Sequence, residues 1–495
     1  MNTVYSLWGV ILEEQPHNIP AGSAFYDNMI HSFLVGFNRW KAWQRQTADR
    51  RVFTALMIVG GCTVVVKLVA FLKDAIVAYQ FGTGDAMDAF LIALVLPQFA
   101  VMLIGTSLNT ALIPTYIQVR EREGRVAANR LMSSVMSIAS LFLVGVSLLL
   151  GLSASYVLPL LASGFSPSKL LLAQSLYLPL LCTLLLYGVG TIWGAVLNAV
   201  NRFALVATVP VVTSLATIGS VLALTKSYGV HALAFGAVGG ALIETGLIGW
   251  WLHREQVSIV PRWSGMSPAI REVLGQYMPM VAGAFLMGGA TVVSQSMAAM
   301  LDPGSVSVLT YASKVTNLLI GVGATAVSTA FLPHFSRLTA TQDWQGVRRT
   351  LGTYSQLLFL LSIPAVALLS YFSEGVIALF FQRGAFTSAD THVVAYVQVM
   401  YLLQVPVYVV GMLFVRLVSA LRANQLMMWG NVVNLLLCIV LTYALVQVLG
   451  VAGVALATSL IYFFNTSFLY VMSMRTLRRM QALSGSQGKT FSGFQ

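Results

Sequence analysis

The chain has 495 residues, of which 57% are hydrophobic and 9% are charged, with a formal net charge of +12 and a mean hydropathy of +0.81. Soluble domains carry about a quarter of their residues as Asp, Glu, Lys or Arg, so this composition excludes an ordinary soluble protein. Many apolar stretches exceed the ~20 residues that cross the hydrocarbon core of a bilayer. The positive charge suggests a nucleic-acid partner only until the charges are placed, and we expect none.

Residues 1–51 precede the first expected membrane helix. Apolar residues between Phe25 and Trp43 share one helix face and are accompanied by basic residues, which predicts an amphipathic helix on the cytoplasmic membrane surface. Twelve apolar stretches of sufficient length follow. They should be helices, because backbone groups in lipid must be hydrogen-bonded internally. We place them at 53–80, 87–113, 131–155, 170–198, 203–224, 229–252, 273–299, 306–333, 351–372, 391–418, 426–448 and 451–474.

The basic residues give the orientation of these helices. With the N-terminus in the cytoplasm, twenty-two of the 28 lysines and arginines fall in inside loops or tails. The outside loops hold only Lys169, Lys226 and Arg383. This asymmetry follows the positive-inside rule. It predicts a multi-pass membrane protein with both termini in the cytoplasm.

The chain repeats itself at long range. The stretch ALIPTYIQVREREGRVAANRL from Ala111 resembles AFLPHFSRLTATQDWQGVRRTL from Ala330, with Pro114 and Pro333 219 residues apart. Parallel repeats of this kind are a transporter architecture. We therefore predict an all-α polytopic membrane protein with about 12 transmembrane helices in two six-helix lobes. The predicted divisions are an extension at 1–51, a first lobe at 52–254, a cytoplasmic linker at 255–270, a second lobe at 271–475 and a cytoplasmic tail at 476–495.

Charged residues inside the expected spans are the first candidates for function. They are Lys67, Lys73 and Asp74 in the first span, Glu244 in the sixth and Lys314 in the eighth. A charge at the centre of a bilayer costs several kcal/mol, so such side chains usually face a wet interior. Lysines that converge on one cavity from two lobes would bind a doubly charged anion such as a diphosphate.

The sequence lacks the motifs of several enzyme classes. The chain has no GxxxxGK[ST], no HExxH and no CxxC, and the expected outer loops are short. We therefore predict no catalytic residues, no metal and no cofactor. Besides the transport of such an anion, three other functions stay open. An ion-coupled exporter of small cationic drugs needs an acidic cavity, whereas the buried residues are net basic. A membrane glycan transferase or ligase is disfavoured by the short outer loops, and a non-transporting scaffold for lipid-linked sugars is compatible with the sequence.

Seven motifs, taken together, resemble the MurJ/MviN-type lipid II flippases of the MATE-like multidrug/oligosaccharidyl-lipid/polysaccharide exporter superfamily. The resemblance covers roughly residues 55–475 and implies two six-helix lobes around a central cavity. Two further helices usually follow in that family, and we expect none here. The motifs are KLVAFLKDAIVAYQFGTGDAMDAF (67–90), Leu96-Pro97, LIPTY (112–116), LNAVNRF (197–203), TYASKV (310–315), FLPHFSRL (331–338) and FQRGAF (381–386).

The resemblance implies a flippase that moves an undecaprenyl-diphosphate-linked saccharide across the cytoplasmic membrane by alternating access, and we expect a functional monomer. Basic residues of the family's first and eighth helices serve the lipid-linked diphosphate. They match Lys67, Lys73 and Lys314, where arginine is usual. A needed acid near the start of the second helix matches Asp88.

Two positions depart from the family pattern. Val101 stands in place of a cavity arginine and Thr106 in place of an acid. An exopolysaccharide repeat unit therefore fits as well as lipid II. The membrane potential, sodium or protons are candidate driving forces. The candidate residues for coupling, or for pairing with the lysines, are Asp74, Glu244, Asn431 and Asn434.

Overall fold

The computed structural model describes residues 48–491, except 259, 422 and 424. The amphipathic helix expected between Phe25 and Trp43 lies outside these residues. The chain divides by its contacts into two compact units, residues up to Val64 and residues from Val65 onward. The candidate site residues named above all belong to the second unit.

The first part of the described chain consists of helices separated by short turns. α4 has 68 residues, but Gly124 leaves helical geometry with φ +86° and ψ 178°, so α4 is two arms joined by a bend. Ser166 caps the start of α6, where its side chain accepts the N–H of Lys169, and Pro167 occupies the first turn. The helices are α3 (Ala48–Phe81), α4 (Asp85–Leu152), α5 (Ala154–Leu161), α6 (Pro167–Ala199), α7 (Phe203–Thr208), α8 (Pro210–Tyr228) and α9 (His231–Arg254).

The second part is built in the same way. Asp343 caps α12 by accepting the N–H of Gly346, and Thr387 with Asp390 forms a capping box at the start of α14. The helices are α10 (Pro268–Ala299), α11 (Ser305–Ala340), α12 (Trp344–Tyr371), α13 (Ser373–Phe381), α14 (Ser388–Leu402), α15 (Gln404–Ala420), α16 (Gln425–Leu449) and α17 (Val451–Phe491).

Ten helical segments of the described residues are long and apolar enough to cross a membrane. The two arms of α4 count once among them and α3 is not among them, so separating the arms and adding α3 gives the twelve spans expected. The prediction of an all-α, multi-pass membrane protein is confirmed. Two helices run well past their expected ends, α11 to Ala340 and α17 to Phe491.

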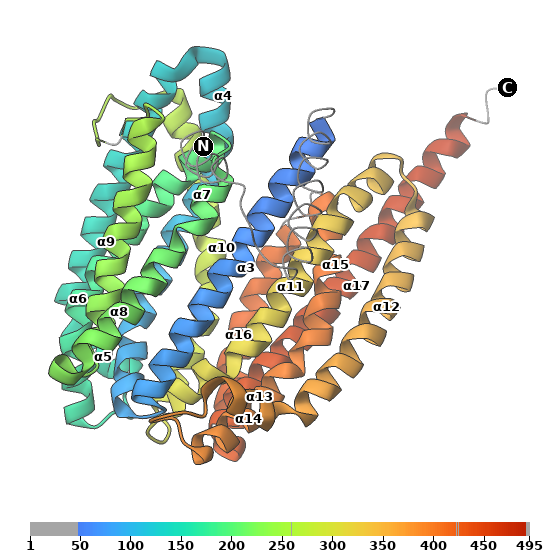
Figure 1. The fold of residues 1–495 in the computed structure, drawn as a ribbon. Coiled ribbons are helices and arrows are strands. Elements are labelled where there is room, and N and C mark those ends of the chain that lie inside the picture. Colours follow the sequence, from blue (N-terminus) through green and yellow to red (C-terminus); the bar gives the residue numbers. More distant parts are fainter. Residues whose placement is uncertain (1–47, 259, 422, 424, 492–495) are drawn as a thin grey trace, which may run out of the picture. The chain divides into compact units, whose positions relative to one another are not determined.

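The helices of the second unit pack in two groups (Figure 1). In the first, α4, α6 and α9 share a buried apolar cluster that includes Leu112 and Leu252, together with residues of α10. In the second, α11, α12, α15 and α17 share a cluster that includes Phe335 and Leu413. α10 packs on both α4 and α16, and a third cluster draws residues from both groups. The exact lobe boundaries therefore stay a prediction.

Four turns meet at one end of the helices, which we call the closed end: those joining α3 to α4, α5 to α6, α10 to α11, and α13 to α14. Gly82 and Gly384 have φ of +58° and +61°. A Cβ on Gly82 would clash with the carbonyl of Ala385, and one on Gly384 with the carbonyl of Tyr79. The N–H of Ala385 donates to the Tyr79 carbonyl at 2.8 Å. The topology predicted from the basic residues has these four turns outside the cell.

Gly240 allows α9 to lie directly against α8. A Cβ on Gly240 would lie 2.7 Å from Cα of Thr213, whereas a Cβ on the neighbouring Gly239 meets nothing within 4 Å. We expect Gly240→Ala to lower the melting temperature of the purified protein in detergent, because overpacking costs about 1–3 kcal/mol. Gly239→Ala is the matched control and should melt like the parent. Equal melting of the two variants would show that the α8–α9 contact tolerates the extra atom.

Candidate functional site

Two lysines from distant parts of the chain meet on one carboxylate. Lys73 Nζ lies 3.1 Å from Asp74 Oδ1, both on α3, and Lys314 Nζ of α11 lies 2.7 Å from Asp74 Oδ2. The lysine side chains are 30% and 31% exposed, whereas the Asp74 side chain is 15% exposed. We call these three residues the lysine bridge. It carries one net positive charge, and neither lysine side chain is buried.

Aromatic packing fixes α3 against α11 close to the lysine bridge. The ring of Phe71 lies 5.6 Å from that of Phe381, and the ring of Tyr311 lies 5.4 Å from the same Phe381. Tyr311 is fully buried and stands three residues before Lys314. Ring pairs at these distances attract each other beyond the area that they bury. The cluster therefore holds the helices that carry the two lysines.

Lys67 lies on α3 seven residues before Asp74 and is exposed. On a helix this spacing is about 10 Å along the axis and about 20° around it. Lys67 is thus on nearly the same face as Asp74, but two turns away. The structure brings Lys73 and Lys314 together and leaves Lys67 as a separate cation farther along α3.

Asp88 lies at the closed end and not at the lysine bridge. Its side chain is 1% exposed. Oδ2 accepts hydrogen bonds from the ammonium of Lys169 at 2.9 Å and from the N–H of Gly304 at 2.8 Å. Oδ1 accepts a hydrogen bond from the N–H of Ser307 at 2.8 Å. These N–H groups belong to the start of α11, where a negative charge is favourable. In this conformation both oxygens of Asp88 are occupied by the protein, and its contact with substrate stays a prediction.

Lys169 was expected on an outer loop, and it lies in the first turn of α6 at the closed end, where it is buried. It is 7% exposed. Besides Asp88 it pairs with Asp85 at 2.7 Å, and its Nζ lies 4.1 Å from the centre of the Phe165 ring. A signal was present: Asp85 and Asp88 are three residues apart at the start of a helix, on one face. Two carboxylates at that spacing favour a nearby cation.

The other candidate residues lie in other interfaces. Glu244 of α9 accepts a hydrogen bond from the Thr213 hydroxyl of α8. Asn431 and Asn434 are half-buried on α16. Their part in ion coupling stays a prediction.

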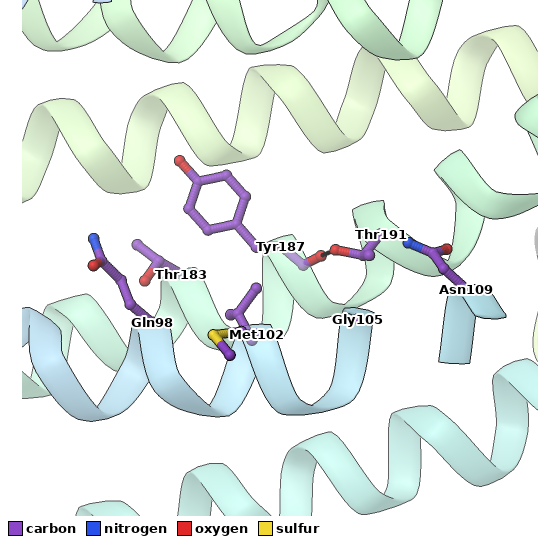
Figure 2. Close-up of a pocket in the computed structure, with 8 residues that line it drawn as sticks. Gln98, Met102, Gly105, Asn109, Thr183, Tyr187 and Thr191 are labelled. Atoms are coloured by element: carbon purple, nitrogen blue, oxygen red, sulfur yellow. Dashed lines mark hydrogen bonds between the residues drawn. The ribbon is translucent and has the colours of Figure 1, made fainter. Parts of the chain in front are cut away.

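A cavity of about 350 Å³ lies between α4 and α6 (Figure 2), and we call it the α4–α6 cavity. None of the residues that line it carries a charge. Amide and hydroxyl groups supply its polar atoms, and Val101 is among its apolar residues. The lining residues are Gln98, Val101, Met102, Gly105 and Asn109 of α4, and Thr183, Tyr187 and Thr191 of α6.

Comparison with known proteins identifies the family. Residues 77–491 match the family described as lipid II flippase MurJ. A probable lipid II flippase MurJ of Rhizobium meliloti is 25% identical over 425 residues, which cover 83% of this chain and 78% of that protein. Another, of Synechocystis sp., is 26% identical over 444 residues, which cover 84% and 81%. These relatives are named as flippases, which are transporters and not enzymes.

Solved structures share the fold. A lipid II flippase MurJ in an inward closed conformation superposes with a TM-score of 0.73 at 23% identity, covering 86% of this chain and 90% of that one. An inward-facing multidrug transporter of the MATE family superposes with a TM-score of 0.69, and an outward-facing one with 0.58, at 13% and 15% identity. The first covers 86% of this chain and 99% of its own, the second 86% and 96%. The predicted MATE-like architecture is confirmed, and by the match over residues 77–491 the chain belongs to the lipid II flippase MurJ family.

Proposed function

We propose that this protein moves a saccharide linked to a polyprenyl diphosphate from the inner to the outer leaflet of the bacterial cytoplasmic membrane. Membership of a flippase family supports the transport of a lipid. The lysine bridge supports the diphosphate, because it brings two partly exposed lysines of different helices, α3 and α11, to one place. A headgroup of this kind cannot enter hydrocarbon without a severe desolvation cost. The cations compensate for that cost while the lipid tail stays in the bilayer.

Asp74 acts in this proposal as the partner of the lysines in the empty state. A single carboxylate satisfies both ammonium groups until a doubly charged diphosphate competes for them. Lysine suits this exchange, because its ammonium is a compact charge on a flexible stem. Lys67, two turns farther along α3, gives the headgroup a third cation on its route.

The closed end supports an inward-facing state. We take this end as the extracytoplasmic side because the outside loops of the predicted topology meet there. The higher TM-score with the inward-facing transporter than with the outward-facing one agrees with this orientation. Opening then requires Asp88 to leave the start of α11. A membrane potential of 100 mV supplies ~2.3 kcal/mol for each charge moved. Sodium or protons, with Asp74, Glu244, Asn431 or Asn434 as carriers, are the other candidate driving forces.

Two glycans fit the proposal. Lipid II is the substrate named for the relatives. An exopolysaccharide repeat unit is the second, and the observation that favours it is Val101, which leaves the α4–α6 cavity without a charge where the family pattern has an arginine. We expect the protein to act as a monomer with both termini in the cytoplasm, as the distribution of basic residues indicates.

The lysines can be tested by truncation. Lys73→Ala and Lys314→Ala should each reduce translocation of a fluorescent lipid-linked saccharide in proteoliposomes by roughly tenfold or more, since losing a contact to a charged group costs about 1.5–3 kcal/mol. Lys226→Ala is the matched control, because Lys226 is exposed at the end of α8. If Lys73→Ala and Lys314→Ala both translocate the lipid at the parental rate, at equal protein amounts, the proposed diphosphate site is contradicted.

Replacing Asp74 gives a second test, in which the variant should bind the ligand more tightly. Asp74→Asn removes the charge that competes with the ligand and keeps the shape of the side chain. We expect inorganic diphosphate to bind several-fold more tightly to this variant, as measured by calorimetry, and Asp74→Glu to bind it like the parent. Weaker binding to Asp74→Asn would mean that the carboxylate positions the lysines and does not compete with the ligand.

Asp88 tests the closed end. Breaking a buried ion pair costs about 3–5 kcal/mol, whereas an exposed one contributes about 0–1 kcal/mol. Asp88→Asn should therefore lower the melting temperature clearly. Asp85→Asn should change it little, because Asp85 pairs with the same Lys169 but its side chain is 56% exposed. Similar melting of both variants would show that the contacts of Asp88 do not hold this end together.

A further inference from the structure

We propose that the segment joining α9 to α10 is a fixed strap, which stays bound to the second arm of α4 while the two helix groups move. The strap consists of residues 255–264, of which the structure describes all but 259. This inference rests on the proposed function, because it concerns the motion that transport needs. It implies that the ends of α9 and α10 joined by the strap keep their separation, so the headgroup does not enter between them.

One side of α4 supplies the contacts that bind the strap. Arg125, Asn129 and Ser133 are four residues apart just after the bend of α4, so they lie on neighbouring turns of one helix face. Arg125 Nη2 donates to the carbonyl of Glu255 at 2.9 Å, and Asn129 Nδ2 donates to that of Gln256 at 3.0 Å. The strap and the helix run in the same direction, so successive turns of α4 hold successive parts of the strap.

Two serines of α4 hold the rest of the strap. Ser133 Oγ lies 3.0 Å from both the Ser258 hydroxyl and the Val260 carbonyl. Ser134 Oγ lies 2.7 Å from the Ser264 hydroxyl and accepts a hydrogen bond from the N–H of Ser264 at 3.3 Å. Ser133 and Ser134 are 5% and 0% exposed. Buried hydroxyls are normally hydrogen-bonded, and the strap supplies their partners.

The beginning of the strap is also fixed from two other sides. Val257 is 6% exposed and belongs to the buried cluster shared by α4, α6 and α9. Glu255 Oε1 lies 2.7 Å from Nη2 of Arg202, which follows α6. Among the described residues of the strap, the longest stretch without a contact of this kind is 261–263. A hinge between two moving bodies needs free chain length, and a stretch this short provides little.

The start of α10 packs on the same buried cluster. Ile270 and Val273 are each 1% exposed and belong to it. Both ends of the strap therefore lie on the first helix group, since α9 belongs to that group as well. The strap does not have to span a gap between the two groups, and it can stay bound when they move.

Disulfides test whether the strap must leave α4. The hydroxyl pairs Ser133–Ser258 and Ser134–Ser264 are close enough for cysteines at these positions to bond after a small adjustment. Two double variants of the full-length protein are needed: Ser133→Cys with Ser258→Cys, and Ser134→Cys with Ser264→Cys. In proteoliposomes, each should translocate the lipid-linked saccharide equally fast in its oxidised and reduced forms. The parent with its native cysteines is the control for oxidation itself.

A disulfide across the closed end is the matched control. Thr83 donates its hydroxyl to the Asp390 carboxylate, so Thr83→Cys with Asp390→Cys joins the α3–α4 turn to the start of α14. This variant should lose translocation on oxidation and regain it on reduction, because the closed end must open. If a strap disulfide has the same reversible effect, the strap must leave α4 and the inference is wrong. If the closed-end disulfide changes nothing, the proposed alternating access fails, whatever the strap variants do.

A labelling experiment tests the strap without a transport assay. Val257 is buried, whereas Arg262 is exposed. In detergent, Val257→Cys should react with a maleimide much more slowly than Arg262→Cys, and equally slowly before and after the lipid-linked saccharide is added. Peptide mass spectrometry distinguishes these sites from the native cysteines. Faster reaction of Val257→Cys once the lipid is present would show that the strap leaves α4, and would overturn the inference.

Discussion

A positive charge inside a membrane must be paired or hydrated, and this requirement explains the arrangement around Asp74. Either lysine alone would be costly at this depth. One carboxylate between Lys73 and Lys314 lowers the cost for both, while about a third of each lysine side chain stays exposed. The pairing is incomplete, since two cations share one anion. The remaining positive charge is what makes the site suitable for a diphosphate.

Asp88 is a second paired carboxylate, and its pairing is complete. It is sealed from the surroundings at 1% exposure and meets three donors, one ammonium and two backbone N–H groups at the start of α11. A buried and fully satisfied carboxylate makes a rigid contact, whereas an accessible bridge can exchange partners. The chain thus uses one acid to close an end of the helix packing and another to hold its cations ready. In the proposed alternating access, the closed end must open after the ligand has displaced the bridge.

The lysine bridge and the α4–α6 cavity differ in charge. The lysine bridge would supply attraction to any polyprenyl diphosphate and so would not distinguish one glycan from another. None of the residues that line the α4–α6 cavity is charged. Val101 keeps that cavity neutral. Family membership therefore leaves open which glycan is carried.

The sequence alone determined the helices, their number and the family. Membrane helices satisfy their own backbone and must be about 20 apolar residues long, so local composition suffices, as the expected span at 170–198 and the observed α6 (Pro167–Ala199) show. The sequence also marked Lys73 and Lys314 as unusual, because charge is rare in such spans. Only the tertiary structure decided that both meet on Asp74, that Asp88 caps α11, and that Lys169 is buried. These contacts join segments far apart in the chain, and their energies depend on distance and burial, which no local pattern records.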